Sequence, residues 1–146
     1  MSVAERTGAC VWLTGRSGAG KTTVAAAVVE ELRRRGAPVA LVDAADVSAH
    51  LSAAEPTDAL GWLARLFTTA GAIVVVAADD PRRASRDQIR ADVPGFVEIF
   101  VDGGAGRDHY EEPVAPELRV PTHDRSVEAS SAQVVSWLER AGIAPP

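Results

Sequence analysis

Short apolar segments alternate along the chain with longer segments in which apolar residues recur every three or four positions. Continuous apolar segments predict buried strands, and the periodic segments predict helices that place one face on a core. We expect strands over residues 10–14, 38–42, 73–78, 96–101 and 118–120, and helices over residues 22–35, 56–70, 82–92 and 126–141. Residues 44–51 are expected to form a short helix or a loop. This alternation is typical of a parallel sheet covered by helices on both faces, a doubly wound α/β fold of about five strands.

A glycine-rich loop separates the first expected strand from the first expected helix. Residues 15–22 read Gly-Arg-Ser-Gly-Ala-Gly-Lys-Thr, which matches the phosphate-binding pattern G-x-x-x-x-G-K-[ST] of P-loop (Walker A) proteins. In this pattern backbone N–H groups surround the phosphates, Lys21 reaches the outer phosphates, and the hydroxyl of Thr22 is a ligand of Mg²⁺. We therefore expect a P-loop kinase fold with ATP and Mg²⁺ as cofactors. The residues expected to bind the nucleotide are Gly15, Ser17, Gly18, Ala19, Gly20, Lys21, Thr22 and Thr23.

The cationic side chains are almost all arginine. Of the fifteen lysines and arginines taken together, only Lys21 is a lysine. A lysine ammonium is a compact point charge, whereas an arginine guanidinium is a broad planar fork. Because a tight phosphate-binding loop requires a compact charge, Lys21 is the first candidate catalytic residue.

The remaining composition excludes several classes of protein. The length suits a single domain over residues 1–146, and the net charge of −5 without a long basic segment argues against a nucleic-acid partner. No apolar segment is long enough to span a bilayer, so we expect no membrane partner and a cytoplasmic protein. Cys10, the single cysteine, cannot form an internal disulfide and is expected in the core. The tryptophans Trp12, Trp62 and Trp137 are expected to pack against other residues rather than bind a ligand.

Two aspartates follow expected strands, at the sheet edge where open α/β sheets bind their ligands. Asp43 ends the second strand and either orients an acceptor hydroxyl or takes its proton, or instead caps the helix that follows. Asp80, or Asp79 beside it, follows the third strand and either holds the water shell of the metal or forms a turn before Pro81. The candidate catalytic residues are therefore Lys21, Asp43 and Asp80, and the candidate metal ligands are Thr22 and Asp80.

Several arginines follow the third expected strand. Arg83, Arg86 and Arg90 are spaced by three and four residues and therefore share one face of the expected helix. Arg83 and Arg86 are candidate ligands of an anionic substrate or of the γ-phosphate, because a guanidinium can bind two phosphate oxygens at once. The alternative is a solvated helix face on which the arginines pair with Asp87, and we favour this alternative for Arg90.

Several segments together resemble the adenylylsulfate (APS) kinases. Residues 11–23 are similar to the P-loop of that family, and residues 71–87 resemble its third strand and the arginine-containing segment after it. Residues 96–102 resemble its fourth strand, and residues 110–113 (Tyr-Glu-Glu-Pro) and 116–118 (Pro-Glu-Leu) resemble its C-terminal elements. The resemblance implies transfer of the γ-phosphate of ATP to the ribose 3′-hydroxyl of adenosine 5′-phosphosulfate (APS), and a homodimer.

Other segments depart from the family pattern. Family members read Asp-Gly-Asp-Asn and then an arginine after the second strand, where this chain has Ala45 at the second aspartate and Ser48 at the arginine. The segment that lines the APS pocket of the family has no match between residues 51 and 63. The lid of the family is missing, because Arg107 is followed almost directly by Tyr110. By the resemblance, Arg107 matches the arginine at the base of the lid and contacts the nucleotide.

Two functions remain open from the sequence. The first is an ATP- and Mg²⁺-dependent kinase of the APS kinase type, which phosphorylates a hydroxyl of a small-molecule acceptor that the sequence does not identify. The second is a catalytically degenerate nucleotide-binding module with a regulatory or partner role, in which Asp43 and Asp46 are structural. The two differ in whether ATP turnover depends on an acceptor.

Overall fold

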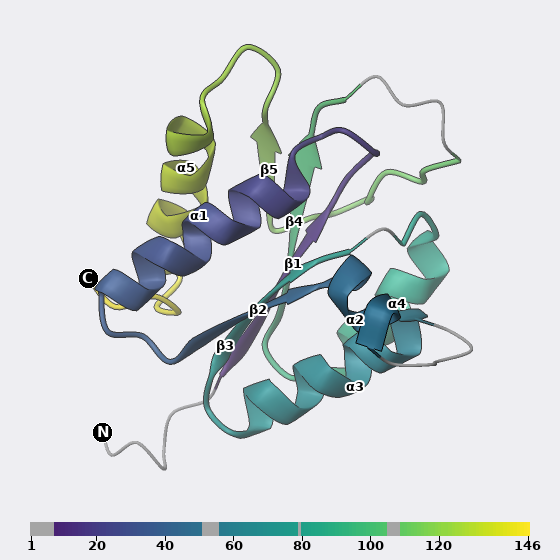
Figure 1. Ribbon diagram of the computed structural model, residues 1–146, viewed down its shortest axis with the longest axis horizontal. Coiled ribbons are helices and arrows are strands. Elements are labelled where there is room, and N and C mark those ends of the chain that lie inside the picture. The colour runs from purple at the N-terminus through teal and green to yellow at the C-terminus, as the bar shows by residue number, and fades with distance from the viewer. Residues whose placement is uncertain (1–7, 51–55, 79, 105–108) are drawn as a thin grey trace.

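The computed structural model describes residues 8–50, 56–78, 80–104 and 109–146. The strands are β1 (Ala9–Thr14), β2 (Val39–Asp43), β3 (Ile73–Ala77), β4 (Phe96–Asp102) and β5 (Leu118–Pro121) (Figure 1). The helices are α1 (Lys21–Arg34), α2 (Ala44–His50), α3 (Pro56–Thr69), α4 (Arg83–Asp92) and α5 (Val127–Arg140). The expected strands and the four long expected helices are present, with bounds that differ by no more than one residue at either end. Within these ranges no helix has the length and apolar character needed to cross a bilayer.

The five strands of the described residues lie parallel in one sheet, in the order β2-β3-β1-β4-β5. The central strand β1 places Val11 beside Val75 of β3 and beside Val97 of β4. Because parallel strands need long connections, the chain crosses between β1, β2, β3 and β4 through helices. The carboxyl ends of all these strands meet at one edge, where the P-loop leaves β1 (Figure 1). The doubly wound α/β fold expected from the sequence is confirmed.

Helices cover both faces of this sheet. α1 and α5 pack together on one face, and α2, α3 and α4 lie on the other (Figure 1). Successive side chains of a strand point to opposite faces. Val11 and Leu13 of β1 accordingly join the core under α1 and α5, whereas Cys10 and Trp12 join the core under α3 and α4. Burial on both faces explains why β1 is a continuous apolar segment in the sequence.

The cysteine and two of the tryptophans lie where the sequence predicts. Cys10 is fully buried, and burial raises the pKa of its thiol to about 12, so it remains a protonated core residue at neutral pH. Trp12 is fully buried, and Trp137 is partly buried against the core. The prediction for Trp62 is wrong, because this residue is 60% exposed on the outer surface of α3.

A set of ion pairs joins the segment before β5 to α4 and β4. Arg90 of α4 pairs with Glu117 of this segment and also lies 3.4 Å from Glu98 of β4. Glu117 accepts a further hydrogen bond from the backbone N–H of Glu98 (2.9 Å). Burial disfavours the charged form of Glu117, but the hydrogen bonds from Arg90 and from the Glu98 backbone outweigh burial and lower its pKa. The partners of Arg90 are therefore Glu117 and Glu98 rather than the expected Asp87, because Arg90 faces β4.

We expect Glu117→Gln to lower the free energy of unfolding by roughly 1 to 2 kcal/mol at neutral pH, because a charged hydrogen-bonded pair loses one of its charges. The pKa of Glu117 is lowered in the folded protein. Its charge therefore stabilises the fold above the usual glutamate pKa of about 4.3, and this contribution is lost as pH falls through the folded pKa. The difference between wild type and variant should shrink on acidification, which urea denaturation at several pH values measures. Glu30→Gln on the exposed surface of α1 is the control, and a pH-independent difference would contradict the assignment.

Candidate functional site

The P-loop begins where β1 ends and runs directly into α1. Thr14 is the last residue of β1, residues 15–20 form the loop, and Lys21 is the first residue of α1. Gly20 occupies the N-cap position with a φ of 96°, a left-handed conformation that residues with a side chain disfavour. Among the described residues, no side chain caps this end of α1 by a hydrogen bond. The positive end of the helix dipole lies here, where an anion binds well.

The loop packs tightly against the end of β4 and the residues that follow it. A Cβ atom added to Gly104 would lie 2.7 Å from the carbonyl O of Ser17 and 3.0 Å from the backbone N of Ala19, and Gly104 has a φ of 77°. A Cβ atom added to Gly15 would collide with the carbonyl O of Val101. Glycine is therefore required on both sides of this contact, which brings two stretches of backbone together.

A second contact holds the loop from the direction of β5. Thr122 directly follows β5 and donates a hydrogen bond from its hydroxyl to the carbonyl O of Ala19 (2.8 Å). The same hydroxyl fills the space that a side chain on Gly103 would need. Sequence reasoning identified neither Gly103, Gly104 nor Thr122, although a Gly-Gly pair directly after a strand is a signal of close backbone approach.

Lys21 lies against the start of the loop. Its ammonium donates hydrogen bonds to the carbonyl O atoms of Gly15 (2.6 Å) and Arg16 (3.3 Å). Lys21 is only 8% exposed, so its charge is held against the loop rather than in solvent. Together with the backbone N–H groups, this charge makes the loop a site for phosphate oxygens.

The fold brings Thr22 and Asp43 together at the carboxyl edge of the sheet. The hydroxyl of Thr22, in the first turn of α1, donates a hydrogen bond to Oδ2 of Asp43 at the end of β2 (3.1 Å). Oδ1 of Asp43 accepts a hydrogen bond from the backbone N–H of Ala45 (2.8 Å) and so caps α2. The two roles considered for Asp43 are therefore compatible, because one carboxylate oxygen serves the helix and the other faces the P-loop. Contact of Asp43 with an acceptor stays a prediction.

Asp80 is the buried acidic residue of this edge. It is only 4% exposed, and its Oδ1 accepts a hydrogen bond from the backbone N–H of Arg82 (3.1 Å), as expected for an aspartate in a turn before proline. Its Oδ2 is buried without a hydrogen-bond partner among the described residues. A buried polar oxygen destabilises the folded protein unless a hydrogen-bond donor or a cation contacts it. The surroundings of Asp80 therefore suit a residue that lies beside a bound metal ion. Asp79 lies outside the described residues.

The candidate arginines differ sharply in exposure. Arg83 is exposed, and the carboxylate of Glu111 accepts a hydrogen bond from its backbone N–H (3.0 Å) and lies 3.9 Å from its guanidinium. Arg86 is only 1% exposed and donates to Glu98 (3.2 Å) and to the carbonyl O of Asp80 (2.8 Å). Arg86 and Arg90 turn toward Glu98 of β4, whereas Arg83 at the start of the helix lies beside Glu111. Arg86 is therefore an internal ion-pair partner, and a contact of its side chain with a substrate stays a prediction.

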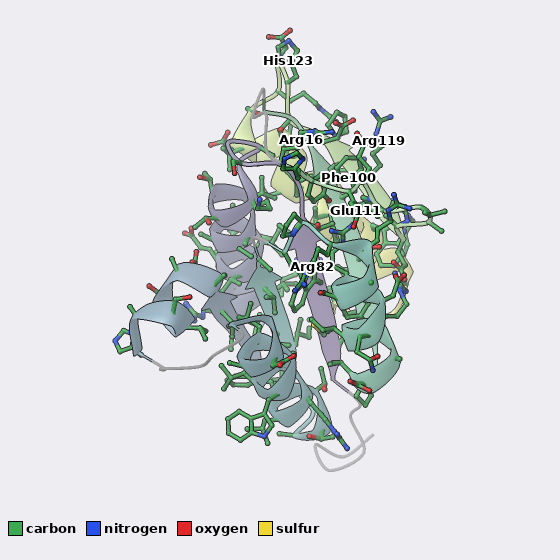
Figure 2. All side chains as sticks on the ribbon, turned by 90° about the vertical axis from the view of Figure 1, so that its right-hand side faces the viewer. Arg16, Arg82, Phe100, Glu111, Arg119 and His123 are labelled. Atoms are coloured by element: carbon green, nitrogen blue, oxygen red, sulfur yellow. The ribbon has the colours of Figure 1, made fainter. Side chains whose placement is uncertain are left out.

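Two further arginines, which sequence reasoning did not single out, lie at the same edge. Arg82 directly precedes α4, is largely exposed, and lies 4.0 Å from Asp80. Arg16 occupies the second position of the P-loop and lies 3.7 Å from Glu112. In the view of Figure 2, Glu111 lies below Arg16 and above Arg82. The carboxyl edge thus carries arginines near the P-loop, and each lies beside a carboxylate.

A hollow beside the P-loop extends toward the connection between β5 and α5. It is lined by the loop and the first turn of α1, by Gly104 and by residues 122–127. Asp124 in its lining has a φ of 56°, which is uncommon for a residue other than glycine. Sequence reasoning did not identify this wall of the site. Arg107, the expected nucleotide contact from the lid, lies outside the described residues.

Comparison with known protein sequences identifies relatives over most of the chain. A family model described as Adenylylsulphate kinase matches residues 7–106. The adenylyl-sulfate kinase of Synechococcus sp. (strain JA-2-3B'a(2-13)) is 32% identical, with coverage of 94% of this chain and 98% of that protein. The probable bifunctional SAT/APS kinase 2 of Sorangium cellulosum is 34% identical over 94% of this chain, which spans 30% of that longer protein. Both alignments extend over 172 positions, more than the 146 residues of this chain, so the relatives contain residues in the matched region that this chain lacks.

Solved structures show the same likeness. The Mycobacterium tuberculosis APS kinase in complex with AMPPNP and APS has a TM-score of 0.80 at 25% identity, with coverage of 92% of this chain and 99% of that chain. The hexameric APS kinase from Thiobacillus denitrificans has a TM-score of 0.82 at 33% identity, with coverage of 97% of this chain and 31% of that chain. The P-loop kinase fold expected from the sequence is therefore confirmed.

We expect Gly104→Ala to weaken ATP binding by at least about tenfold, equivalent to about 1.4 kcal/mol, because the new Cβ would press on Ser17 and Ala19 and displace the loop. Gly36→Ala is the matched control, since Gly36 has a φ of 79° and nothing within 4 Å of an added Cβ. Both substitutions carry the backbone cost of a left-handed alanine, about 1 to 2 kcal/mol of stability. Calorimetric titration with ATP measures the difference. Equal ATP affinity of the two variants would show that the Gly104 contact does not shape the site.

Proposed function

The chain belongs to the adenylylsulphate kinase family of ATP-dependent phosphotransferases, and from this membership we propose its reaction. The protein transfers the γ-phosphoryl group of ATP to a hydroxyl of APS, or of an acceptor with the same anionic, nucleotide-like chemistry. The observation that carries the proposal is the hydrogen bond between Thr22 and Asp43 (3.1 Å). It joins a carboxylate that can serve an acceptor to the loop that binds the transferred phosphate.

The P-loop supplies the nucleotide half of the site. The backbone N–H groups of residues 15–20 and of the first turn of α1 surround the β- and γ-phosphates, and the ammonium of Lys21 offsets their charge. The hollow lined by residues 122–127 takes the base and ribose, because it adjoins the loop and the first turn of α1. In this orientation the γ-phosphate points toward Thr22 and Asp43.

Asp43 and the exposed arginines supply the acceptor half. The acceptor oxygen attacks the γ-phosphorus, the bond from that phosphorus to the β–γ bridging oxygen breaks, and ADP leaves. The proton of the acceptor hydroxyl passes to the carboxylate of Asp43. Arg82 and Arg83, which are exposed at the start of α4, bind the anionic groups of the acceptor. Arg86 supports them from inside through its bonds to Asp80 and Glu98.

Thr22 and Asp80 are suited to the Mg²⁺ ion that the reaction requires. Mg²⁺ keeps several waters and is typically bound by one or two carboxylates together with phosphate oxygens. The hydroxyl of Thr22 and the buried Oδ2 of Asp80 are oxygen donors of this kind, and this Oδ2 has no partner within the described ranges. When bound, the ion offsets the charge on the transferring phosphate. Asp, Glu, His and Cys side chains of the described residues form no group of three that could hold a metal. Phosphate oxygens of the nucleotide and water molecules would complete the ligand set.

The acceptor half has fewer binding groups than the family pattern provides. Ala45 and Ser48 replace an aspartate and an arginine of that pattern, and aligned relatives contain residues in the matched region that this chain lacks. Binding of the acceptor anion therefore depends on Arg82 and Arg83. Since fewer charge-assisted hydrogen bonds can form, we expect weak acceptor binding and a site that closes less completely around its substrates.

The test is a coupled assay of ADP formation from ATP with and without APS, followed by a panel of phosphorylated and sulfated nucleotides that carry a free hydroxyl. We expect acceptor-dependent ADP formation. Asp43→Asn should lower kcat by about 100-fold or more, because the proton acceptor is lost, while the Kd for ATP changes by less than about threefold, or about 0.7 kcal/mol.

Asp46→Asn is the matched control, since Asp46 lies one turn further along α2 and is exposed. It should leave kcat unchanged. Micromolar ATP binding without ADP formation for any acceptor would contradict the proposal and would identify a nucleotide-binding module instead.

A further inference from the structure

Tyr110 contacts four separate parts of the carboxyl edge. Its hydroxyl shares a hydrogen bond of 2.7 Å with the hydroxyl of Thr14, the last residue of β1. Its ring stacks on that of Phe100 in β4, with the ring centroids 6.1 Å apart. The guanidinium of Arg86 from α4 lies 5.1 Å from the centroid of the Tyr110 ring, and that of Arg16 from the P-loop lies 5.6 Å from it. One nearly buried side chain thus joins the P-loop to α4.

The next two residues contact the same two elements. The backbone N–H of Glu111 donates to the carbonyl O of Pro81 (2.8 Å), and the carboxylate of Glu111 accepts from the backbone N–H of Arg83 (3.0 Å). The carbonyl O of Glu111 accepts a hydrogen bond from Arg86. Glu112 faces the other way and lies 3.7 Å from Arg16 of the P-loop. Residues 110–112 therefore bridge the P-loop and the start of α4.

We propose that residues 110–112 form a brace that holds the P-loop at a fixed position relative to α4, and that Tyr110 is the positioning residue of this brace. The inference rests on the proposed function, in which the P-loop binds the phosphates and the start of α4 binds the acceptor. Transfer requires the two reacting groups at a fixed separation and alignment, and small displacements are costly. Tyr110 acts through Thr14 and Arg16 and contacts neither ATP nor acceptor.

The hydroxyl pair of Tyr110 and Thr14 is suited to this purpose. Thr14 is fully buried and Tyr110 nearly so, which protects the hydrogen bond from competing water. Burial raises the pKa of Tyr110, so its phenol keeps its proton at neutral pH and remains able to donate. Loss of one hydroxyl leaves the other buried without its partner, whereas loss of both leaves no such group. A double-mutant cycle therefore isolates this contact.

The experiment compares Tyr110→Phe, Thr14→Val and the double variant with wild type. Tyr110→Phe keeps the ring that contacts Phe100 and the two arginines and removes only the hydroxyl. Two quantities are measured: the amide hydrogen exchange of residues 15–20 in the ligand-free protein, and the Kd for ATP. We expect each single variant to speed exchange in the loop by about tenfold and to raise the Kd for ATP by about three- to tenfold. The double variant should be no worse than the more affected single variant.

Glu139→Gln is the control, because it removes only an ion pair with Arg35 near the end of α5, outside the brace, and should change both quantities by less than about twofold. Unchanged exchange and unchanged ATP affinity in Tyr110→Phe, with only a lower Tm, would overturn the brace and leave ordinary packing. Additive effects in the double variant would also overturn it, because the hydroxyl pair would then not be the contact that matters. Hydrogen exchange is measured without ligand and therefore tests the brace independently of ATP binding. A wild type that fails to bind ATP would refute the proposed function, but the exchange rates would still show whether the brace exists.

Discussion

The close backbone contact of the P-loop with the end of β4 and the residues after it determines the shape of the site. Gly15 lies against the carbonyl of Val101, and Gly104 lies against Ser17 and Ala19, with no room for a side chain at either glycine. The loop is thereby fixed to the end of β4 rather than held only by its own turns. A phosphate-binding loop gains affinity from this arrangement, because ordering its N–H groups during binding would otherwise subtract from the binding free energy.

The parallel sheet explains why residues from distant parts of the sequence meet at this edge. Strands β2, β3 and β1 are neighbours, and they end at or just before Asp43, Asp80 and the P-loop. The nucleotide half of the site consists mainly of backbone groups, which glycine spacing and strand packing specify. The acceptor half depends on individual side chains, which can change without loss of the fold. This difference explains why the chain keeps the P-loop pattern of its family but departs from the family pattern after β2, at Ala45 and Ser48.

Local patterns in the sequence were enough to predict the elements and the nucleotide loop. The continuous apolar segment of β1 reflects burial on both faces. The spacing of Gly15, Gly20 and Lys21 is the sequence pattern of a loop that surrounds phosphates with backbone N–H groups. Contacts between distant residues were not predictable in this way. Helical spacing placed Arg86 on a face with Arg83 but could not show that the Arg86 side chain turns inward to Glu98 while Arg83 stays exposed. The contact of Thr122 with Ala19 joins residues 103 positions apart and has no local signature.

The central claim is that this loop binds the phosphates of ATP. Calorimetric titration of wild type and Lys21→Ala with ATP and with adenosine tests it most directly, because adenosine has the base and ribose but no phosphate. We predict that wild type binds ATP at least about 100-fold more tightly than adenosine, a difference of about 2.7 kcal/mol. Lys21→Ala should remove most of this difference while leaving adenosine binding unchanged. Equal affinity of wild type for ATP and adenosine would contradict the account.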